Sequence, residues 1–81
     1  MLKELKEIER ADEALYLRFS NHPVAKTQSF GNGVVAVDID HYDEVVGIEI
    51  LALGPQEMQA LGRVVEKYQL SLDALVHASA A

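Results

Sequence analysis

The densest group of potentially reactive side chains lies between residues 38 and 43, where Asp38, Asp40 and Asp43 flank His41. Carboxylate oxygens at spacings of two and three residues are ligands that a hard cation such as calcium or magnesium prefers. However, the stretch lacks the glycine at the sharp bend of a calcium loop. The simpler explanation is that Asp38 and Asp40 point outward from a strand and that Asp43 lies in a turn, where aspartate binds nearby backbone amides. We therefore predict no metal site and no cofactor.

A second group of polar residues is scattered along the chain and meets only if neighbouring strands bring it together. Period-two alternation places Tyr16, Arg18, Thr27, Asp38 and Glu49 on the outward face of a predicted sheet. Paired carboxylates near a tyrosine suit acid and base chemistry. Cross-strand pairs of arginine with a carboxylate are also routine on solvated sheets. Tyr16, Arg18, Asp38 and Glu49 are therefore candidate binding residues, and no residue is predicted to be catalytic.

The remaining side chains give little support to enzymatic activity. The three histidines, at positions 22, 41 and 77, are isolated in predicted turns or in the tail, whereas zinc needs three or four convergent ligands. We predict that they are solvated surface histidines. No serine, Ser20 included, lies in a nucleophile-elbow context. The chain has no cysteine, which excludes a disulfide framework and fits a cytoplasmic location.

The elements that must position these residues are strands between residues 14 and 53. Alternating apolar residues predict strands over 14–20, 24–30, 34–40 and 45–53, with Leu17 and Ile48 among the inward positions. The Asn32-Gly33 pair between two strand patterns predicts a hairpin, because both residues tolerate positive φ. The small, polar residues of 24–30 indicate a sheet edge. Together the hairpins form an antiparallel meander of four to five strands.

The period changes from two to 3.6 residues at Gly54-Pro55, which predicts an amphipathic helix over 55–68. Ser71 is the N-cap of a possible second short helix, and the helical tail extends to about residue 78. The chain is thus predicted to be one α+β domain over 1–81, with its sheet over about 5–53. For the first ten residues two alternatives stay open, a helix and a strand. The spacing of Leu2, Leu5 and Ile8 favours the helix.

The strand sequences resemble a known family. The stretches from Glu13 to Phe19, from Gly33 to Asp40 and from Val45 to Leu51 are similar to the small prokaryotic family catalogued as domain of unknown function 2283. The resemblance runs from about Glu9 to Leu53, and the Ala-Leu-Tyr and Val-Gly-Ile-Glu segments are its most telling parts. It implies a compact meander sheet with a helix, an N-terminal strand in place of the helix alternative, and an antitoxin-like binding partner. It implies no reaction.

Charge and hydropathy restrict the partners. Thirteen acidic residues against seven basic ones give a net charge of −6, so phosphate backbones are repelled and nucleic acid is not a predicted partner. No apolar run is long enough for a membrane span. Four apolar residues fall on the outward strand phase, and contiguous apolar surface on a small protein usually marks association. These residues of the predicted dimer or partner surface are Val34, Val45, Leu51 and Leu53.

This surface predicts a homodimer, or a sheet extended edge to edge through 24–30, unless the C-terminal helices fold over it. Two functions remain as hypotheses. The first is a noncatalytic protein-interaction module whose acidic surface binds a basic protein partner. The second is a small-ligand-binding or metal-dependent enzyme that uses the outward face around Tyr16, Arg18, Asp38 and Glu49.

Overall fold

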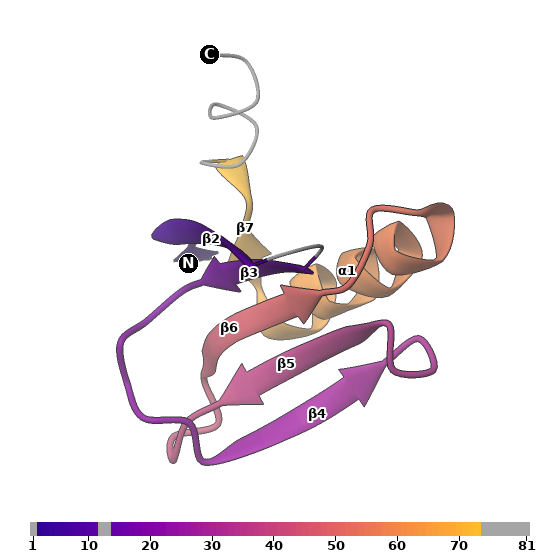
Figure 1. Ribbon diagram of the computed structural model, residues 1–81. Coiled ribbons are helices and arrows are strands. Elements are labelled where there is room, and N and C mark those ends of the chain that lie inside the picture. The colour runs from indigo at the N-terminus through magenta and orange to yellow at the C-terminus, as the bar shows by residue number, and fades with distance from the viewer. Residues whose placement is uncertain (1, 12–13, 74–81) are drawn as a thin grey trace.

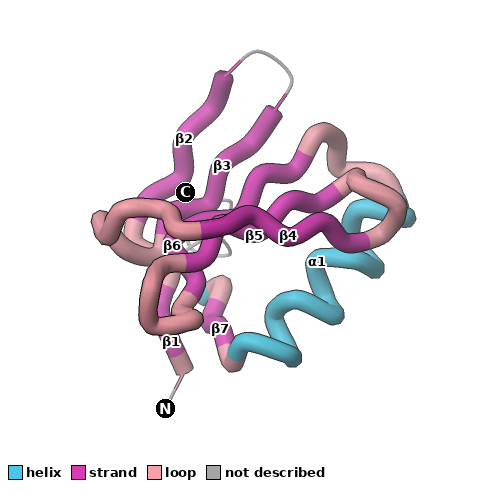
Figure 2. The backbone as a smooth tube through the Cα atoms, turned by 90° about the horizontal axis from the view of Figure 1, so that it is seen from below, coloured by secondary structure: helices cyan, strands magenta, loops and turns pink. Residues whose placement is uncertain are grey.

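The computed structural model describes residues 2–11 and 14–73 as two layers, a five-stranded antiparallel sheet and one helix along one of its faces (Figures 1 and 2). The strand order in the sheet is β2-β3-β6-β5-β4, and β1 pairs with β7 in a separate parallel ladder. The elements are β1 (Lys3–Glu4), β2 (Glu7–Ala11), β3 (Ala14–Arg18), β4 (Lys26–Phe30), β5 (Val35–Ile39), β6 (Val45–Ile50), α1 (Pro55–Tyr68) and β7 (Leu70–Ser71). The predicted α+β class is confirmed.

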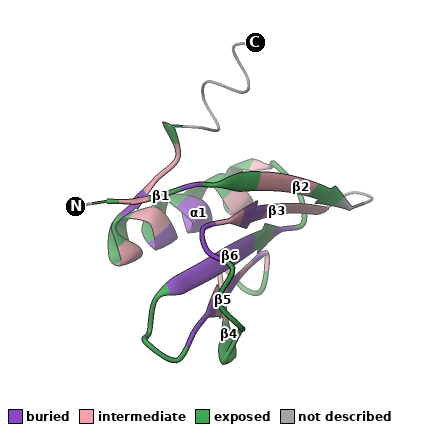
Figure 3. Ribbon diagram, turned by 90° about the vertical axis from the view of Figure 1, so that its left-hand side faces the viewer, coloured by how far each residue is buried: buried purple, intermediate pink, exposed green. Residues whose placement is uncertain are grey.

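The strand order agrees with the predicted meander for three strands and differs from it for β3. Strands β4, β5 and β6 pair consecutively as expected, and the β4–β5 turn has positive φ at Gly31, Asn32 and Gly33. Strand β3, however, pairs with β6 and not with its sequence neighbour β4. This order places the apolar strands side by side, so that Leu17, Ile48 and Val37 lie in one inward row. It leaves the polar strand β4 at the predicted sheet edge (Figure 3).

The core lies between the inward sheet face and α1. Ala60, Leu61 and Val64 are the buried residues of the helix, while Met58 is 42% exposed. Pro55 occupies the first turn, where its missing N–H costs nothing, and Gln69 ends the helix in the left-handed conformation. The fully buried sheet residues include Leu17, Val35, Val37, Ile48 and Ile50, and Phe19, directly after β3, is fully buried as well.

The described chain carries a short strand near each end, β1 and β7, and these two strands pair. Residues 2–11 contain β1 and β2, so the strand alternative is right and the helix alternative is wrong. Ser71 lies in β7, paired with Glu4, and its hydroxyl oxygen accepts the backbone N–H of Asp73 at 3.4 Å, the contact expected of the predicted N-cap. Asp73, the last described residue, is helical. The rest of the predicted second helix lies outside the described residues.

A β-bulge in β6 corrects the predicted phase of Val45. Asp38 pairs with Gly47 but Ile39 pairs with Val45, so Val46 is an extra residue in the ladder. Val45 consequently points into the core, and both valines are 1% exposed. The prediction that Val45 lies on an outward surface is therefore wrong. Val34 lies in the β4–β5 turn and packs against the core as well, whereas Leu51 and Leu53 are exposed as predicted.

Replacing a central inward side chain tests this assignment of faces. Ile48 is fully buried between Leu17 and Val37 in the register, so Ile48→Ala is expected to lower the free energy of unfolding by about 2 to 5 kcal/mol. Urea unfolding measures the loss. Gln59→Ala on the exposed side of α1 is the control, and an equal effect of the two substitutions would contradict the assignment.

Candidate functional site

The outward sheet face carries a hydrogen-bonded group centred on Asp38. The Tyr16 hydroxyl donates to Asp38 Oδ2 at 2.8 Å, and the Thr27 hydroxyl donates to Asp38 Oδ1 at 2.6 Å. These three residues come from β3, β5 and β4, and the Tyr16 side chain must cross β6 to reach its acceptor. The structure therefore brings Tyr16 and Asp38 together, as the alternation of the strands predicted.

Gly47 on β6 makes this crossing possible. A Cβ atom built on Gly47 would overlap the ring and the hydroxyl of Tyr16, so the aromatic ring lies directly on the glycine backbone. Gly47 is the register partner of both Arg18 and Asp38, which places it between the two strands that the ring connects. An aromatic side chain that covers a glycine on a neighbouring strand also restores the packing that the missing side chain would give.

Arg18 covers the Tyr16 ring and extends the group to the edge strand β2. Its guanidinium carbon lies 5.1 Å from the ring centroid, within the range of a cation–π contact. Its Nε donates to Glu9 Oε2 at 2.6 Å. Polar and aromatic contacts thus run from Glu9 on β2 to Thr27 on β4 and touch every strand of the five-stranded sheet.

The electrostatics of this group keep the Tyr16 phenol in its neutral form. Burial raises the pKa of Tyr16 well above its usual value, and the hydrogen bond to the Asp38 carboxylate raises it further. The phenol therefore stays protonated at neutral pH, donating to Asp38. Both Asp38 oxygens already accept hydrogen bonds, and Glu9 is paired with Arg18. The groups that could act as acid and base are used to hold the strands together.

Glu49 is the candidate residue that this group does not include. It lies on the same face, in register with Tyr16 and Ala36, and its side chain is exposed. Within residues 2–11 and 14–73 it makes no hydrogen bond or ion pair. The structure thus unites Tyr16, Arg18 and Asp38 and leaves the Glu49 carboxylate open to solvent.

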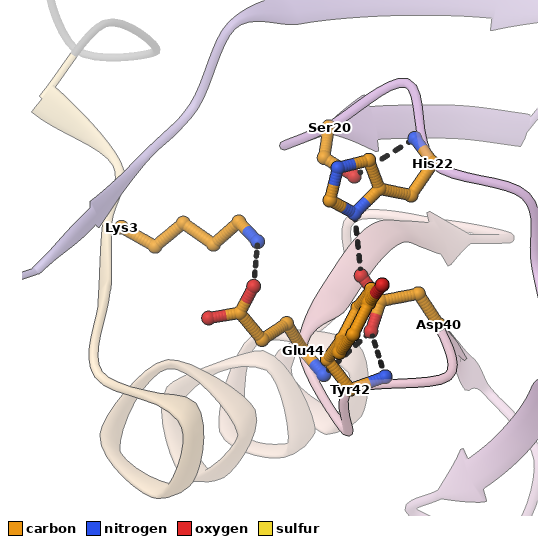
Figure 4. A network of polar contacts seen from close by, with 6 residues as sticks. All are labelled: Lys3, Ser20, His22, Asp40, Tyr42 and Glu44. Carbon is orange, nitrogen blue, oxygen red and sulfur yellow. Dashed lines mark hydrogen bonds and ion pairs between the residues drawn. The ribbon is translucent and has the colours of Figure 1, made fainter.

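A second polar cluster, centred on Asp40, was missed by the sequence analysis (Figure 4). Asp40 is only 3% exposed, so the prediction that it points outward is wrong. Its Oδ2 lies 2.7 Å from His22 Nδ1, and its Oδ1 accepts hydrogen bonds from the backbone amides of Tyr42 and Glu44. His22 is half exposed but is a partner of Asp40 and not an isolated histidine. The carboxylate therefore ties the loop after β3 to the turn before β6.

The contacts of the Asp40 cluster stabilise the loop after β3 and the turn before β6. The His22 hydrogen bond, with help from the two backbone amides, lowers the pKa of Asp40 to about 2. The Ser20 hydroxyl oxygen accepts the backbone N–H of His22 at 3.2 Å, an arrangement typical of a local turn. Lys3 forms an ion pair with Glu44 at 3.7 Å and connects β1 to the same turn (Figure 4). A strand-ending aspartate before a tight turn was the available sequence signal.

The described part of the chain meets the requirements of neither a metal site nor a membrane-spanning helix. No group of three or more His, Cys, Asp or Glu side chains there could hold a metal ion. Among the same residues, no helix is long and apolar enough to cross a membrane. The exposed apolar residues of the predicted association surface are reduced to Leu51 and Leu53, at 53% and 69% exposure.

A comparison with protein-family models matches residues 7–53 to "Protein of unknown function (DUF2283)". The matched segment covers more than half of the chain. The chain belongs to the DUF2283 family. The segment extends from β2 to just beyond β6, so every strand of the five-stranded sheet and all of the Tyr16–Asp38 group lie within the DUF2283 match. The comparisons with curated proteins and with solved structures give no match.

The contact of Tyr16 with Gly47 can be tested by adding one methyl group. Gly47→Ala is expected to destabilise the fold by about 1 to 3 kcal/mol, because the new Cβ overlaps the ring and displaces it from Asp38. Urea unfolding measures the change. In the Tyr16→Ala background the same substitution should cost much less, and equal costs in the two backgrounds would show that the ring does not depend on Gly47.

The Asp40 cluster predicts how stability depends on pH. The folded-state pKa of Asp40 is about 2, below the usual 3.8, so its ionised form stabilises the fold above about pH 4 and this contribution is lost as the pH falls toward 2. Asp40→Asn should therefore make the free energy of unfolding less sensitive to pH between about 5 and 2. Asp43→Asn in the same turn, whose side chain is 81% exposed, is the control. If the free energy of unfolding of Asp40→Asn falls with pH as steeply as that of the wild type in this range, this role is contradicted.

Proposed function

We propose that this DUF2283 chain is a noncatalytic protein-interaction module that binds a basic protein partner on its outward sheet face. The observation that carries the proposal is the charge of that face. The strand register places four carboxylates on this face, those of Glu7, Glu9, Asp38 and Glu49. Among the described strand residues of the same face, Arg18 is the only one with a positive charge. Helix α1 packs against the opposite, inward face, so no element of the described chain covers these carboxylates.

Binding on this face can proceed in two steps. The net charge of −6 attracts a basic protein over about a Debye length, roughly 8 to 10 Å at physiological salt. Short-range contacts then involve the open Glu49 carboxylate, with the small Ala36 beside it and the exposed Leu51 two residues further along. A rigid surface favours such binding, because little side-chain entropy remains to be lost around the Tyr16–Asp38 group.

The partner class that we propose is a small basic protein of the same cytoplasm, which gives the chain an antitoxin-like role. The acidic face and the absence of cysteine support this choice. We also propose that the chain is a homodimer. Two features support self-association: Leu51 and Leu53 are exposed close together in the loop before α1, and β4 is an edge of the sheet.

A capture experiment with matched charge variants tests the binding proposal. Immobilised wild-type protein, Glu49→Lys and Glu66→Lys are incubated at low salt with lysate of the source cell, and retained proteins are identified. Glu66 is exposed on α1, so both variants change the net charge equally. We expect a basic protein that is released by salt, retained by Glu66→Lys and strongly reduced with Glu49→Lys.

Two results would contradict the binding proposal. One is equal capture by the Glu49 and Glu66 variants, which would place the partner elsewhere. The other is the absence of a protein partner together with enzymatic turnover that is lost in Tyr16→Phe or Asp38→Asn. That outcome would favour the small-ligand or metal-dependent enzyme instead.

Light scattering tests the homodimer separately. The chain mass is 8.9 kDa, and we expect twice that value at micromolar concentrations. Measurements at several salt concentrations are informative, because two copies that each carry a charge of −6 repel one another and this repulsion weakens as salt rises. A monomer mass at all salt concentrations would refute the dimer.

A further inference from the structure

The two edges of the five-stranded sheet differ in charge. On β2, Glu7, Glu9 and Arg10 place charges along the edge, which is how natural sheets oppose edge-to-edge pairing. On β4, residues 27–30 are Thr, Gln, Ser and Phe and carry no charge. The one charged residue of β4, Lys26, is in an ion pair with Asp43 at 3.2 Å. Strand β4 is therefore the edge that is not protected against pairing (Figure 1).

We propose that β4 pairs in antiparallel orientation with β4 of a second copy, about a two-fold axis at Thr27. The proposal rests on the proposed homodimer and names its interface. It joins the two five-stranded sheets into one continuous sheet along the free edge of β4.

The choice of Thr27 as the centre follows from the residues that each register brings together. A two-fold axis that keeps both outward faces on the same side pairs residues of equal parity, because side chains alternate along a strand. With Thr27 opposite its own copy, Val24 faces Phe30 and Lys26 faces Gln28. Val24 is 49% exposed and Phe30 is half-buried, so this register buries an apolar pair that the single chain leaves open.

The neighbouring register is less favourable. If Gln28 were the centre, Lys26 would face Phe30 of the second copy. The Lys67 ammonium already lies 5.4 Å from that ring centroid and 5.3 Å from the centroid of Tyr68. Two ammonium groups would then compete for one aromatic face, and like charges at such a distance repel. The Thr27-centred register avoids this conflict and also uses more of the segment from Val24 to Phe30.

The continuous sheet has a consequence for partner binding. Both outward faces, each with Glu49 and the Tyr16–Asp38 group, lie on one side of the joined sheet, because the register preserves the faces. A basic partner with two contact points, or a dimeric partner, can then bind both faces at once. Linked binding of this kind raises the overall affinity without any new contact.

Single cysteines provide a direct test, because the natural chain contains none and any disulfide must join two copies. In the Thr27-centred register the two Thr27→Cys side chains are opposite each other, with Cβ atoms about 4.5 to 5.5 Å apart, near the span of a disulfide. Ser29→Cys is the matched control on the same face and strand, since its two introduced thiols would be offset by four residues, about 13 Å. Both Thr27 and Ser29 are exposed.

Oxidised glutathione converts the paired thiols to a disulfide, and a non-reducing gel measures the covalent dimer. We expect rapid cross-linking of Thr27→Cys and at least tenfold slower cross-linking of Ser29→Cys, given the separation that a disulfide tolerates. Equal rates for the two variants, or a faster rate for Ser29→Cys, would overturn the Thr27-centred interface.

A non-covalent variant keeps the test independent of the new thiols. Val24→Lys places an ammonium beside Lys67 of the second copy and should weaken dimerisation by about tenfold or more, measured by sedimentation. Leu53→Lys, on the competing apolar surface, should have no comparable effect. If a dimer forms but only Leu53→Lys dissociates it, the homodimer is supported and the β4 interface is refuted. If the wild type is a monomer at every salt concentration, both proposals are refuted.

Discussion

The outward side of the sheet depends on the contact between the Tyr16 ring and the backbone of Gly47. A side chain at position 47 would occupy the space of the ring, and without the ring lying flat across β6 its hydroxyl could not reach Asp38. The Asp38 carboxylate in turn binds the Thr27 hydroxyl, and Arg18 covers the ring on its way to Glu9. One missing Cβ thus permits a layer of side chains that connects all five strands. The polar atoms of Tyr16, Asp38, Thr27, Arg18 and Glu9 are engaged with one another.

The inward side is organised by apolar packing, and the bulge connects it to the Asp40 cluster. The extra residue, Val46, lets Val45 enter the core, and its carbonyl oxygen accepts hydrogen bonds from the amides of Phe19 and Ser20. The chain between β5 and β6 then turns tightly enough for buried Asp40 to bind the amides of Tyr42 and Glu44 and the ring of His22. A local change in the ladder therefore fixes the two loops at one end of the sheet.

Much of this arrangement could be predicted from the sequence, because strand alternation and turn residues are local signals. The hairpin at Asn32-Gly33, the inward residues Leu17 and Ile48, and the start of α1 at Pro55 were all predicted correctly. The outward placement of Tyr16 and Asp38 followed from the same alternation. The two most telling segments of the family resemblance also lie side by side, with Tyr16 in register with Glu49. The features that were missed depend on distant parts of the chain. Pairing of β3 with β6, and of β1 with β7, reflects the burial of apolar surface across the whole fold and has no local signature. A bulge shifts the phase by one residue, so alternation alone placed Val45 outside. His22 and Asp40 are separated by 18 residues and meet only because the ends of β3 and β5 lie at the same end of the sheet.

We propose that the outward face is a binding surface for cationic protein segments. The most direct measurement is a nuclear magnetic resonance titration of isotope-labelled protein with a nona-arginine peptide at low salt, with nona-glutamate as the control peptide. We expect nona-arginine to cause chemical-shift changes concentrated on Glu49, Ala36 and the neighbouring outward residues of β3, and nona-glutamate to cause none. Shift changes concentrated on α1, or spread evenly over all exposed carboxylates, would contradict it.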